Sequence, residues 1–492
     1  MEIIVSIKPL LAVAVSLFGS LLIIASGKNP NLRESCTFLI AFVKFGIVAS
    51  MVPIVLGGSV ITYNIVEVLP GVGIAFKVDS LGILFAMVSS FLWIVTTFYS
   101  IGYMRPLNEH SQTRYFAFFA LALSSAVGVA FSANLLTLYL FYEMLSLSTY
   151  SLVTHHQDEQ ARHAGRKYLT YLMGTSIAFF LPAIVLTYIY TGTLNFEPHG
   201  ILAGTAPDGM LIVMFILFIA GVGKAAIMPI HSWLPSAMVA PTPVSALLHA
   251  VAVVKVGVFS VLRICFHVYG IQLMHTLSLD MFLIYFISIT ILVGSLFALK
   301  QDDLKARLAY STVSQLSYIV MGGGLLSVIG MSGGIIHIVM HAFGKITLFF
   351  CAGAILVNTG LKKISEMRGI GKKMPVTMAA FFFGSLSVIG IPPFGGFISK
   401  WYLALGAIDA HQMPILVVLL TSSLLNAAYF LPIAYNAFFS TGAHFNESTT
   451  IQEAPVFAVA PPVFTAFVSF LLFFCPSFFL ELAKMAARLA LG

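Results

Sequence analysis

Charged residues are scarce in this chain of 492 residues. Asp, Glu, Lys and Arg together make up 9% of the sequence, whereas hydrophobic residues make up 59%. A soluble domain usually carries about 25% charged residues, so this composition excludes a soluble domain of ordinary kind. We predict an all-α polytopic protein that forms a single membrane domain over residues 1–492 and is surrounded by the lipid bilayer. The net charge of +7 is interpreted as a topology signal, and no nucleic-acid binding is expected.

Cysteine is equally rare. The four cysteines, Cys36, Cys265, Cys351 and Cys475, stand singly, and no CxxC pair occurs. This pattern argues against iron–sulfur and zinc sites, and no GxGxxG motif follows a strand. We therefore predict no metal, no bound cofactor, and no redox or hydrolytic site within this chain. Whether the chain serves as the pumping subunit of an oxidoreductase complex stays open.

Long apolar runs fill the sequence. A membrane span needs about 20 mostly apolar residues, and this window predicts about fourteen transmembrane helices. The first is interpreted as a span and not as a signal peptide, because it is too long and lacks a basic start. The predicted spans are 3–25, 37–57, 80–103, 114–131, 133–154, 168–190, 211–230, 243–268, 280–299, 307–328, 331–357, 375–405, 413–437 and 457–480.

Lys and Arg residues are distributed unevenly over the connecting loops. Alternate loops, among them 155–167, 231–242 and 358–374, hold fifteen of them with their immediate edges, against Lys77, Lys484 and Arg488 on the other side. Under the positive-inside rule the richer side is cytoplasmic, so both termini are predicted to be extracytoplasmic.

A few ionisable residues remain inside the spans. Arg263 lies near a span end, where its charge can reach the interface. Glu143 is the one acidic residue far from any span end. Buried ionisable groups in membranes usually face a protein interior or a water-filled path, and a set of both signs suits proton transfer. The alternative is a static Glu143–Lys224 ion pair that braces two helices. The lysines well inside spans are Lys44, Lys224, Lys255, Lys345 and Lys400.

Histidines add to this set. His337, His341 and Lys345 recur every four residues, so they share one face of a helix. Histidine titrates near neutral pH and can relay protons; the alternative is a pair of hydrogen-bonded core histidines. His249 lies in the same predicted span as Lys255, about 120° away around the axis. The role of Lys44 is not assigned.

Helix breakers stand beside two of the lysines. Pro229 follows Lys224, and Pro392 and Pro393 precede Lys400. Broken helices at corresponding places indicate a transporter built of inverted repeats. We predict helices 1–3 over 1–113, a five-helix repeat over 114–268, a second over 280–437, and a fourteenth helix with a tail over 457–492, with helices 7 and 12 broken.

Together these stretches resemble a known family, the antiporter-like proton-translocating subunits of respiratory complex I, membrane-bound hydrogenase-type complexes and multisubunit cation/proton antiporters. The resemblance covers roughly residues 80–440. Its motifs are LYLFYEMLSLSTY around Glu143, GKAAIMPIHSWLPSAMVAPTPVSALLHA, ALKQDDLKARLAYSTVSQLSYI, HIVMHAFGKITLFFCAGA and GIPPFGGFISKW. It looks most similar to the D-type antiporter subunit, or else to its hydrogenase-complex relatives, because no long lateral helix follows the last span.

The resemblance implies two inverted five-helix repeats around a hydrophilic axis. Glu143 and Lys224 would form the modulating pair, and Lys400 would be the terminal donor. The relay between them would consist of His249, Lys255, His337, His341 and Lys345.

The function that we expect is proton translocation within a multisubunit complex of an energy-coupling membrane, the plasma membrane of a bacterium or archaeon. The expected partners are other membrane subunits. Peripheral redox subunits, sodium transport and the direction of proton movement are left open. The alternatives are the D-type subunit of a secondary sodium/proton antiporter and a membrane scaffold that transports nothing.

Overall fold

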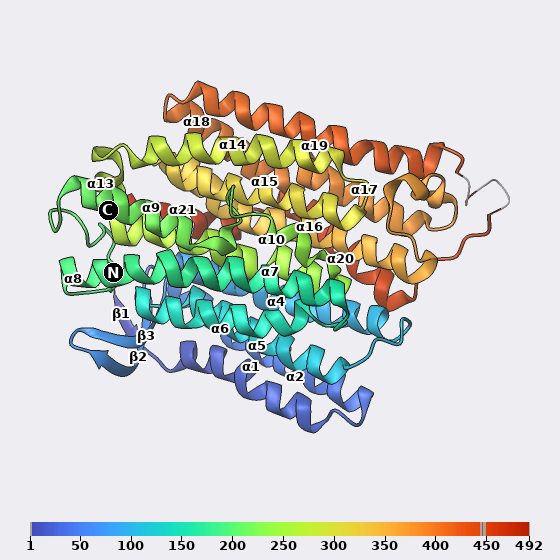
Figure 1. Ribbon diagram of the computed structural model, residues 1–492, viewed down its shortest axis with the longest axis horizontal. Coiled ribbons are helices and arrows are strands. Elements are labelled where there is room, and N and C mark those ends of the chain that lie inside the picture. Colours follow the sequence, from blue (N-terminus) through green and yellow to red (C-terminus); the bar gives the residue numbers. More distant parts are fainter. Residues whose placement is uncertain (1, 443–444, 446–448, 492) are drawn as a thin grey trace.

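The computed structural model describes residues 2–442, 445 and 449–491, and it is dominated by helices that run along one common axis (Figure 1). Among these residues, nine helical segments are long and apolar enough to cross a membrane, and shorter apolar helices lie beside them. Each of the fourteen predicted spans contains at least one helix. The chain is therefore an all-α polytopic membrane protein, as its composition predicts.

The N-terminal part combines helices with a small sheet that was not predicted. Strands β2 and β3 form an antiparallel hairpin, and β1 pairs parallel to β2. β-branched residues recur in both hairpin strands, and Gly71 at the turn adopts φ +75°, a conformation that glycine tolerates. The elements are β1 (Ile3–Val5), α1 (Lys8–Ala25), α2 (Pro30–Ala49), α3 (Val52–Leu56), β2 (Val60–Leu69), β3 (Val72–Val78) and α4 (Ser80–Met104).

The middle of the chain begins with regular helices and then becomes interrupted. The helices are α5 (Gln112–Ala130), α6 (Leu135–Val153), α7 (Glu159–Thr175), α8 (Leu181–Thr191), α9 (Asp208–Gly221), α10 (Trp233–Ser236), α11 (Thr242–Ala250), α12 (Val253–Arg263) and α13 (Ile271–Thr276). Short π-helical segments, Ser176–Phe180 and Ile264–Tyr269, join α7 to α8 and extend α12.

The last part contains the longest helices. These are α14 (Leu279–Lys300), α15 (Leu304–Gly324), α16 (Val328–Thr359), α17 (Pro375–Ile389), α18 (Gly395–Asp409), α19 (Met413–Phe439), α20 (Val456–Phe474) and α21 (Ser477–Leu491). Helix α16 is the centre of the bundle: it contacts α4, α11, α15, α17, α18, α20 and α21. Its most apolar window is entirely buried.

The two predicted helix breaks are present. The seventh span stops at Gly221, and a 3₁₀ turn at Gly223–Ala225 follows. The twelfth span is interrupted between Ile389 and Gly395, where Pro392 and Pro393 stand. Both breaks therefore place a lysine, Lys224 or Lys400, within or just beyond irregular backbone.

Two stretches contain local structure that was not predicted. The predicted cytoplasmic loop 231–242 contains α10, where Trp233 and Leu234 are buried, because its apolar side chains pack against α7 and α15. The eighth span was predicted to be continuous, yet it breaks at Val251 and Ala252, between α11 and α12. Neither residue is a proline or glycine, so the sequence carries no local signal for this break.

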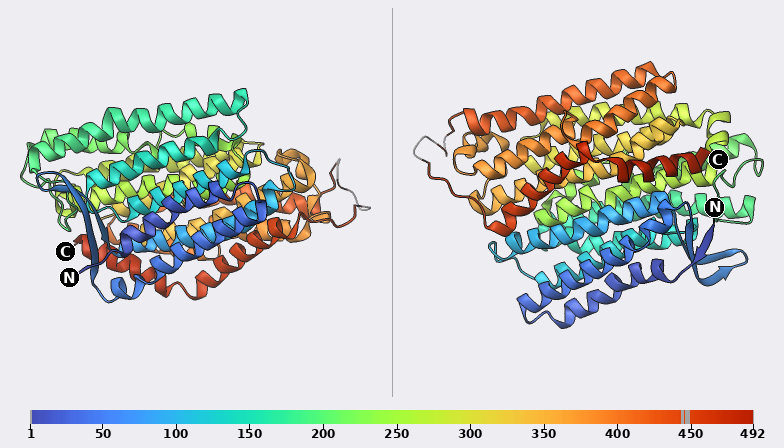
Figure 2. Two further views of the ribbon diagram at one scale, coloured as in Figure 1. Left: turned by 90° about the horizontal axis from the view of Figure 1, so that it is seen from below. Right: turned by 180° about the vertical axis from the view of Figure 1, so that it is seen from behind.

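The predicted C-terminal tail is helical as well. Helix α21 continues α20 after a break at Cys475 and Pro476, and it packs against α4 and α16. Its small residues Ala483, Ala486 and Ala487 are buried in that contact, which allows close helix packing. Figure 2 shows α20 and α21 crossing the bundle one after the other. The two chain termini lie at the same end (Figure 1).

Candidate functional site

The broken seventh span presents Lys224 to α6. The turn that carries Lys224 ends with Ala226 in the left-handed conformation, φ +54°. Gly257 of α12 lies directly against this turn: a Cβ atom there would come within 2.2 Å of the Lys224 carbonyl carbon. The position therefore requires glycine, and α12 holds the break in place.

The Lys224 amine binds to one turn of α6. Its Nζ donates to the Tyr142 carbonyl at 2.9 Å and to Ser146 Oγ at 2.6 Å, and it lies 3.2 Å from the centre of the Tyr142 ring. Glu143 stands on the same turn, but neither carboxylate oxygen has a hydrogen-bond partner. The charges of Glu143 and Lys224 interact through space without a closed ion pair. The structure thus places Glu143 and Lys224 close enough for their charges to interact, and no hydrogen bond joins them.

Lys255 connects α12 to the central helix. Its Nζ donates to the carbonyl of Ile338 in α16 at 3.0 Å, and the side chain is buried. Ile338 precedes His341 by about one helical turn. His249, predicted to work beside Lys255, lies in α11; its side chain falls outside the described part of the structure.

The two histidines of α16 are stacked and fully enclosed. Their ring centres lie 5.6 Å apart with planes inclined by 30°. His337 Nδ1 is 2.8 Å from Ser399 Oγ, and its Nε2 is 3.1 Å from Gln315 Oε1. Neither ring nitrogen of His341 has a hydrogen-bond partner. The alternative of satisfied core histidines therefore fits His337 but does not fit His341.

Lys345, one helical turn after His341 in α16, is bound by α15. Its Nζ donates to Ser311 Oγ at 2.8 Å and to the Leu308 carbonyl at 3.3 Å. The Tyr429 hydroxyl donates to the same Ser311 at 3.1 Å. The amine is thus connected to α15 and, through Ser311, to α19.

Lys400 lies in α18, just after the second helix break. Its Nζ donates to the Ile389 carbonyl at 2.8 Å and to Ser423 Oγ at 3.2 Å. It lies 5.0 Å from the centre of the Tyr318 ring, and that ring makes an edge contact with His337. The irregular backbone before Gly395 frees the carbonyl that holds this amine, because the helix does not continue past Ile389.

None of the ion pairs between described residues involves Lys224, Lys255, Lys345 or Lys400. Sequence reasoning missed the neutral residues that hold these amines. A signal was present, since Ser311, Gln315 and Tyr318 recur at intervals of four and three and so share one face of α15. Polar residues on one face of a buried helix usually have partners inside the bundle.

Lys44 and Arg263 contact none of the lysines and histidines described above. Lys44 is buried and donates to Ser16 Oγ at 2.8 Å and to the Leu123 carbonyl at 2.7 Å. Arg263 was predicted to reach the interface, and this was wrong. It is buried and forms a two-point ion pair with Asp79, including a 2.7 Å bond from Nη2 to Oδ1. The two residues are 184 positions apart, which hid their pairing from the sequence.

These features define the class: a polytopic membrane protein with broken helices and a row of buried amines and imidazoles. Comparison with known proteins then gives the family. The family model described as NADH:quinone oxidoreductase/Mrp antiporter, TM, matches residues 132–426, and the chain belongs to this family.

Relatives come from several kinds of complex. The chain is 36% identical over 373 residues to NADH-quinone oxidoreductase subunit N of Desulforudis audaxviator, covering 75% of this chain and 74% of that one. It is 32% identical to a Na(+)/H(+) antiporter subunit of Alkalihalophilus pseudofirmus, with 82% of this chain and 53% of that one covered. For hydrogenase-4 component B of Escherichia coli, identity is 32%, over 67% and 50% of the two chains. The chain thus spans about half the length of the latter two.

Solved structures share the fold. A chain of the Mrp complex from Dietzia sp. DQ12-45-1b aligns with a TM-score of 0.87 and 24% identity, over 99% of this chain and 100% of that one. A chain of the archaeal membrane-bound sulfane sulfur reductase aligns with a TM-score of 0.89 and 24% identity, over 99% and 98%. The chain is therefore an antiporter-like membrane protein by family and by fold, as the sequence motifs predicted.

Proposed function

We propose that this chain conducts protons across the bilayer along a row that starts at Lys224, passes Lys255, His341 and His337, and ends at Lys400. The observation that carries the proposal is the set of buried amines without carboxylate partners. An unpaired charge in a protein interior is costly, and a structure that only needed stability would not retain several of them.

The hydrogen bonds of these amines suit both protonation states. Lys224, Lys345 and Lys400 each donate to two oxygen atoms. A neutral amine has two N–H groups, so it can keep both bonds after it loses a proton. Proton release therefore leaves no acceptor unsatisfied, and no hydrogen bond is lost when the row is loaded or emptied.

Several buried polar atoms near the row have no hydrogen-bond partner. Such atoms are rare in folded proteins and usually bind water. Those beside the row are Gln315 Nε2, both ring nitrogens of His341, and Asn426 Nδ2. Water bound to these groups would bridge the gaps between the titratable side chains and complete a path for protons.

Glu143 is proposed to control entry into the row. When its carboxylate approaches Lys224, it favours the ammonium form; when it withdraws, the ammonium loses this support and passes its proton toward Lys255. The unpaired carboxylate and the Tyr142 and Ser146 contacts of Lys224 correspond to the withdrawn arrangement.

The test compares Lys224→Met with Lys44→Met in the intact complex, reconstituted into liposomes that contain a pH-sensitive dye. Both lysines are fully buried, but only Lys224 belongs to the row. We expect Lys224→Met to abolish proton movement while assembly is retained, and Lys44→Met to preserve it. Normal proton movement in Lys224→Met would refute the proposed row, and loss of assembly in that variant alone would favour the static brace.

The complex that holds the chain is identified by its partners. Mild detergent extraction followed by mass spectrometry is expected to recover further membrane subunits. Partners with iron–sulfur, nickel–iron or flavin sites would make this an electron-transfer-driven pump. Only small membrane subunits would make it part of a secondary antiporter, with sodium as a substrate to test by ²²Na⁺ uptake. In a scaffold that transports nothing, Lys400→Met would leave coupled ion transport unchanged.

Two inverted repeats are part of the proposal. The break at Lys224 in the seventh span and the break before Lys400 in the twelfth occupy corresponding places in residues 114–268 and 280–437. In this arrangement Lys224 and Lys255 belong to the first repeat, and the two histidines of α16 and Lys400 belong to the second. We also propose that the membrane is the plasma membrane of a bacterium or archaeon.

A further inference from the structure

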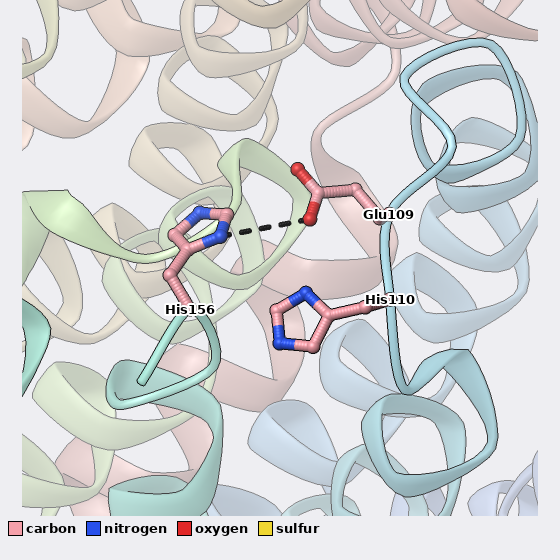
Figure 3. A group of neighbouring side chains, drawn as sticks. All are labelled: Glu109, His110 and His156. Carbon is pink, nitrogen blue, oxygen red and sulfur yellow. Dashed lines mark ion pairs between the residues drawn. The ribbon is translucent and has the colours of Figure 1, made fainter. Parts of the chain in front are cut away.

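A second group of titratable side chains lies apart from the proton row, in two connections between helices. Glu109 and His110 belong to the connection from α4 to α5, and His155 and His156 belong to the connection from α6 to α7. Figure 3 shows Glu109, His110 and His156 turned toward one another. One ligand atom of each of these three lies within 4.8 Å of the others.

The distances to Glu109 match the spacing of metal ligands better than that of hydrogen bonds. Oε2 of Glu109 is 3.6 Å from His156 Nδ1 and 3.7 Å from His155 Nε2. Both separations are too long for a good hydrogen bond. Two ligand atoms around a tetrahedral ion with bonds of about 2.0–2.2 Å lie roughly 3.3–3.6 Å apart. Small side-chain movements would therefore bring these atoms to one ion.

The environment of His155 is a second, independent indication of a bound ion. Its side chain is 0% exposed, and neither ring nitrogen has a hydrogen-bond partner. Its ring centre is 4.8 Å from that of His110 and 5.5 Å from that of His156. A buried imidazole that makes no hydrogen bond costs free energy, and a metal ion bound between these groups would remove that cost.

We propose that Glu109, His110, His155 and His156 form a binding site for a divalent transition-metal ion, with Zn²⁺ as the best match. Three imidazoles and one carboxylate are a donor set that zinc accepts in tetrahedral geometry. Magnesium and calcium prefer oxygen ligands throughout, so this set discriminates against them. His110 is exposed and His156 half-exposed, which gives the ion a route of entry.

The surrounding backbone holds the ligands in position. Asn108, Ser111 and Gln157 adopt left-handed conformations with φ of 49°, 51° and 59°, so the chain turns sharply beside each ligand pair. Arg114 donates from Nη2 to the His155 carbonyl at 2.8 Å. The cationic Arg114 opposes a metal ion electrostatically, whereas the Glu109 carboxylate attracts it.

A bound ion would tie the α4–α5 connection to the α6–α7 connection. These two segments are separated along the chain by helices α5 and α6, which is why the sequence predicted no metal site. His156 also lines a cavity of about 400 Å³ with Tyr103, Ala240 and Lys305. The metal would therefore sit at the edge of this cavity, distant in sequence from the lysines of the row.

The test measures zinc binding to the intact complex in detergent, purified with an affinity tag that contains no histidine and stripped with EDTA. Zn²⁺ is added, free metal is removed, and bound zinc is measured by inductively coupled plasma mass spectrometry. The variants are Glu109→Gln, His110→Ala, His155→Ala and His156→Ala. His163→Ala is the matched control, because His163 is exposed on the nearby α7. His110 is exposed, so its replacement keeps the test valid if His155→Ala does not fold.

We expect the unmodified complex and His163→Ala to bind one additional zinc ion per chain. His110→Ala and His156→Ala should lack this ion. Loss of a ligand should weaken binding at least as much as loss of an outer-shell partner does, about 10–100-fold. A rise in the thermal unfolding midpoint on zinc addition should disappear in the same variants. Equal zinc content and affinity in His110→Ala, Glu109→Gln and the unmodified complex would overturn the proposal.

Discussion

At the scale of single residues, uncharged side chains hold the lysines and histidines of the proposed row in position. Gln315 and Ser399 hold the two nitrogens of His337, and Ser146 and Tyr142 hold Lys224. Each of these residues lies on a different helix from the group it binds. Replacing one of them should therefore disturb transport without removing any charge.

Gln315→Leu tests this expectation. The change removes the acceptor of His337 Nε2 while keeping a side chain of similar size. A hydrogen bond contributes about 0.5–1.5 kcal/mol, so proton translocation should slow by up to roughly tenfold. Gln301→Leu, in the connection before α15, should transport normally in the same dye assay; an unchanged rate in Gln315→Leu would remove this contact from the pathway.

Asp79 offers a prediction about pH and stability. Burial alone would raise the pKa of Asp79, but the Arg263 guanidinium beside it outweighs this and holds the pKa well below its usual value. A carboxyl with a depressed pKa in the folded state contributes stability that is present above its unfolded pKa, about 3.9, and is lost as the pH falls through the folded value.

Asp79→Asn should therefore lower the thermal midpoint in detergent at pH 7, because it leaves Arg263 buried without a partner. Breaking such a pair costs about 3–5 kcal/mol. The difference from the unmodified chain should be constant above about pH 5 and shrink below about pH 4. A difference that stays the same down to about pH 3 would show that the ion pair is not its cause.

At the scale of helices, the interruptions place the functional groups. Lys224 lies on the turn after α9, and Lys400 follows the break between α17 and α18. A third break separates α11 from α12, between His249 and Lys255. Close packing fixes the first break, since α12 meets it at Gly257 with no room for a side chain.

Gly257→Ala should disable the protein through this contact. A Cβ atom at position 257 would lie 2.1 Å from the Ala225 nitrogen, so α12 and the Lys224 turn must separate. We expect a lower thermal midpoint and loss of most proton translocation. Gly46→Ala in α2 is the control, because nothing lies within 4 Å of the added atom. It should preserve proton translocation and should not lower the thermal midpoint, since alanine stabilises a helix interior by about 0.5–1 kcal/mol relative to glycine. Full activity in Gly257→Ala would contradict this assignment.

At the scale of the whole molecule, the positions of the two chain ends bear on the topology. Both termini lie at one end of the bundle (Figure 1), as an even number of crossings requires. The helices surround α16, which carries His337, His341 and Lys345 through the centre. Lys224 and Lys255 precede this helix in the chain and Lys400 follows it, so the proposed row needs groups from both parts of the bundle.

The orientation can be measured in intact cells. Tags or single cysteines placed at the N-terminus and near Arg488 should both react with a membrane-impermeant reagent from outside. A cysteine in the basic connection at 362–363 should react only after permeabilisation, because basic loops stay cytoplasmic. Cys475, which is exposed, is replaced beforehand. The reverse pattern would show that the bundle is inserted the other way.

The sequence alone determined the class, the spans and the titratable residues. Apolar runs of membrane length, five intramembrane lysines, one intramembrane glutamate and two proline breaks are local features, and each follows from the composition of its own segment. The family motifs follow from the same segments.

Only the tertiary structure decided which groups meet. Residues from different helices or connections meet in the Asp79–Arg263 pair, in the Gln315 and Ser399 contacts of His337, and in the cluster of Glu109 with three histidines. The break in the eighth span and the short helix in the loop 231–242 were not predicted for a related reason, since packing against neighbouring helices fixed their conformation. Contacts of this kind depend on how the helices assemble, and no local pattern encodes them.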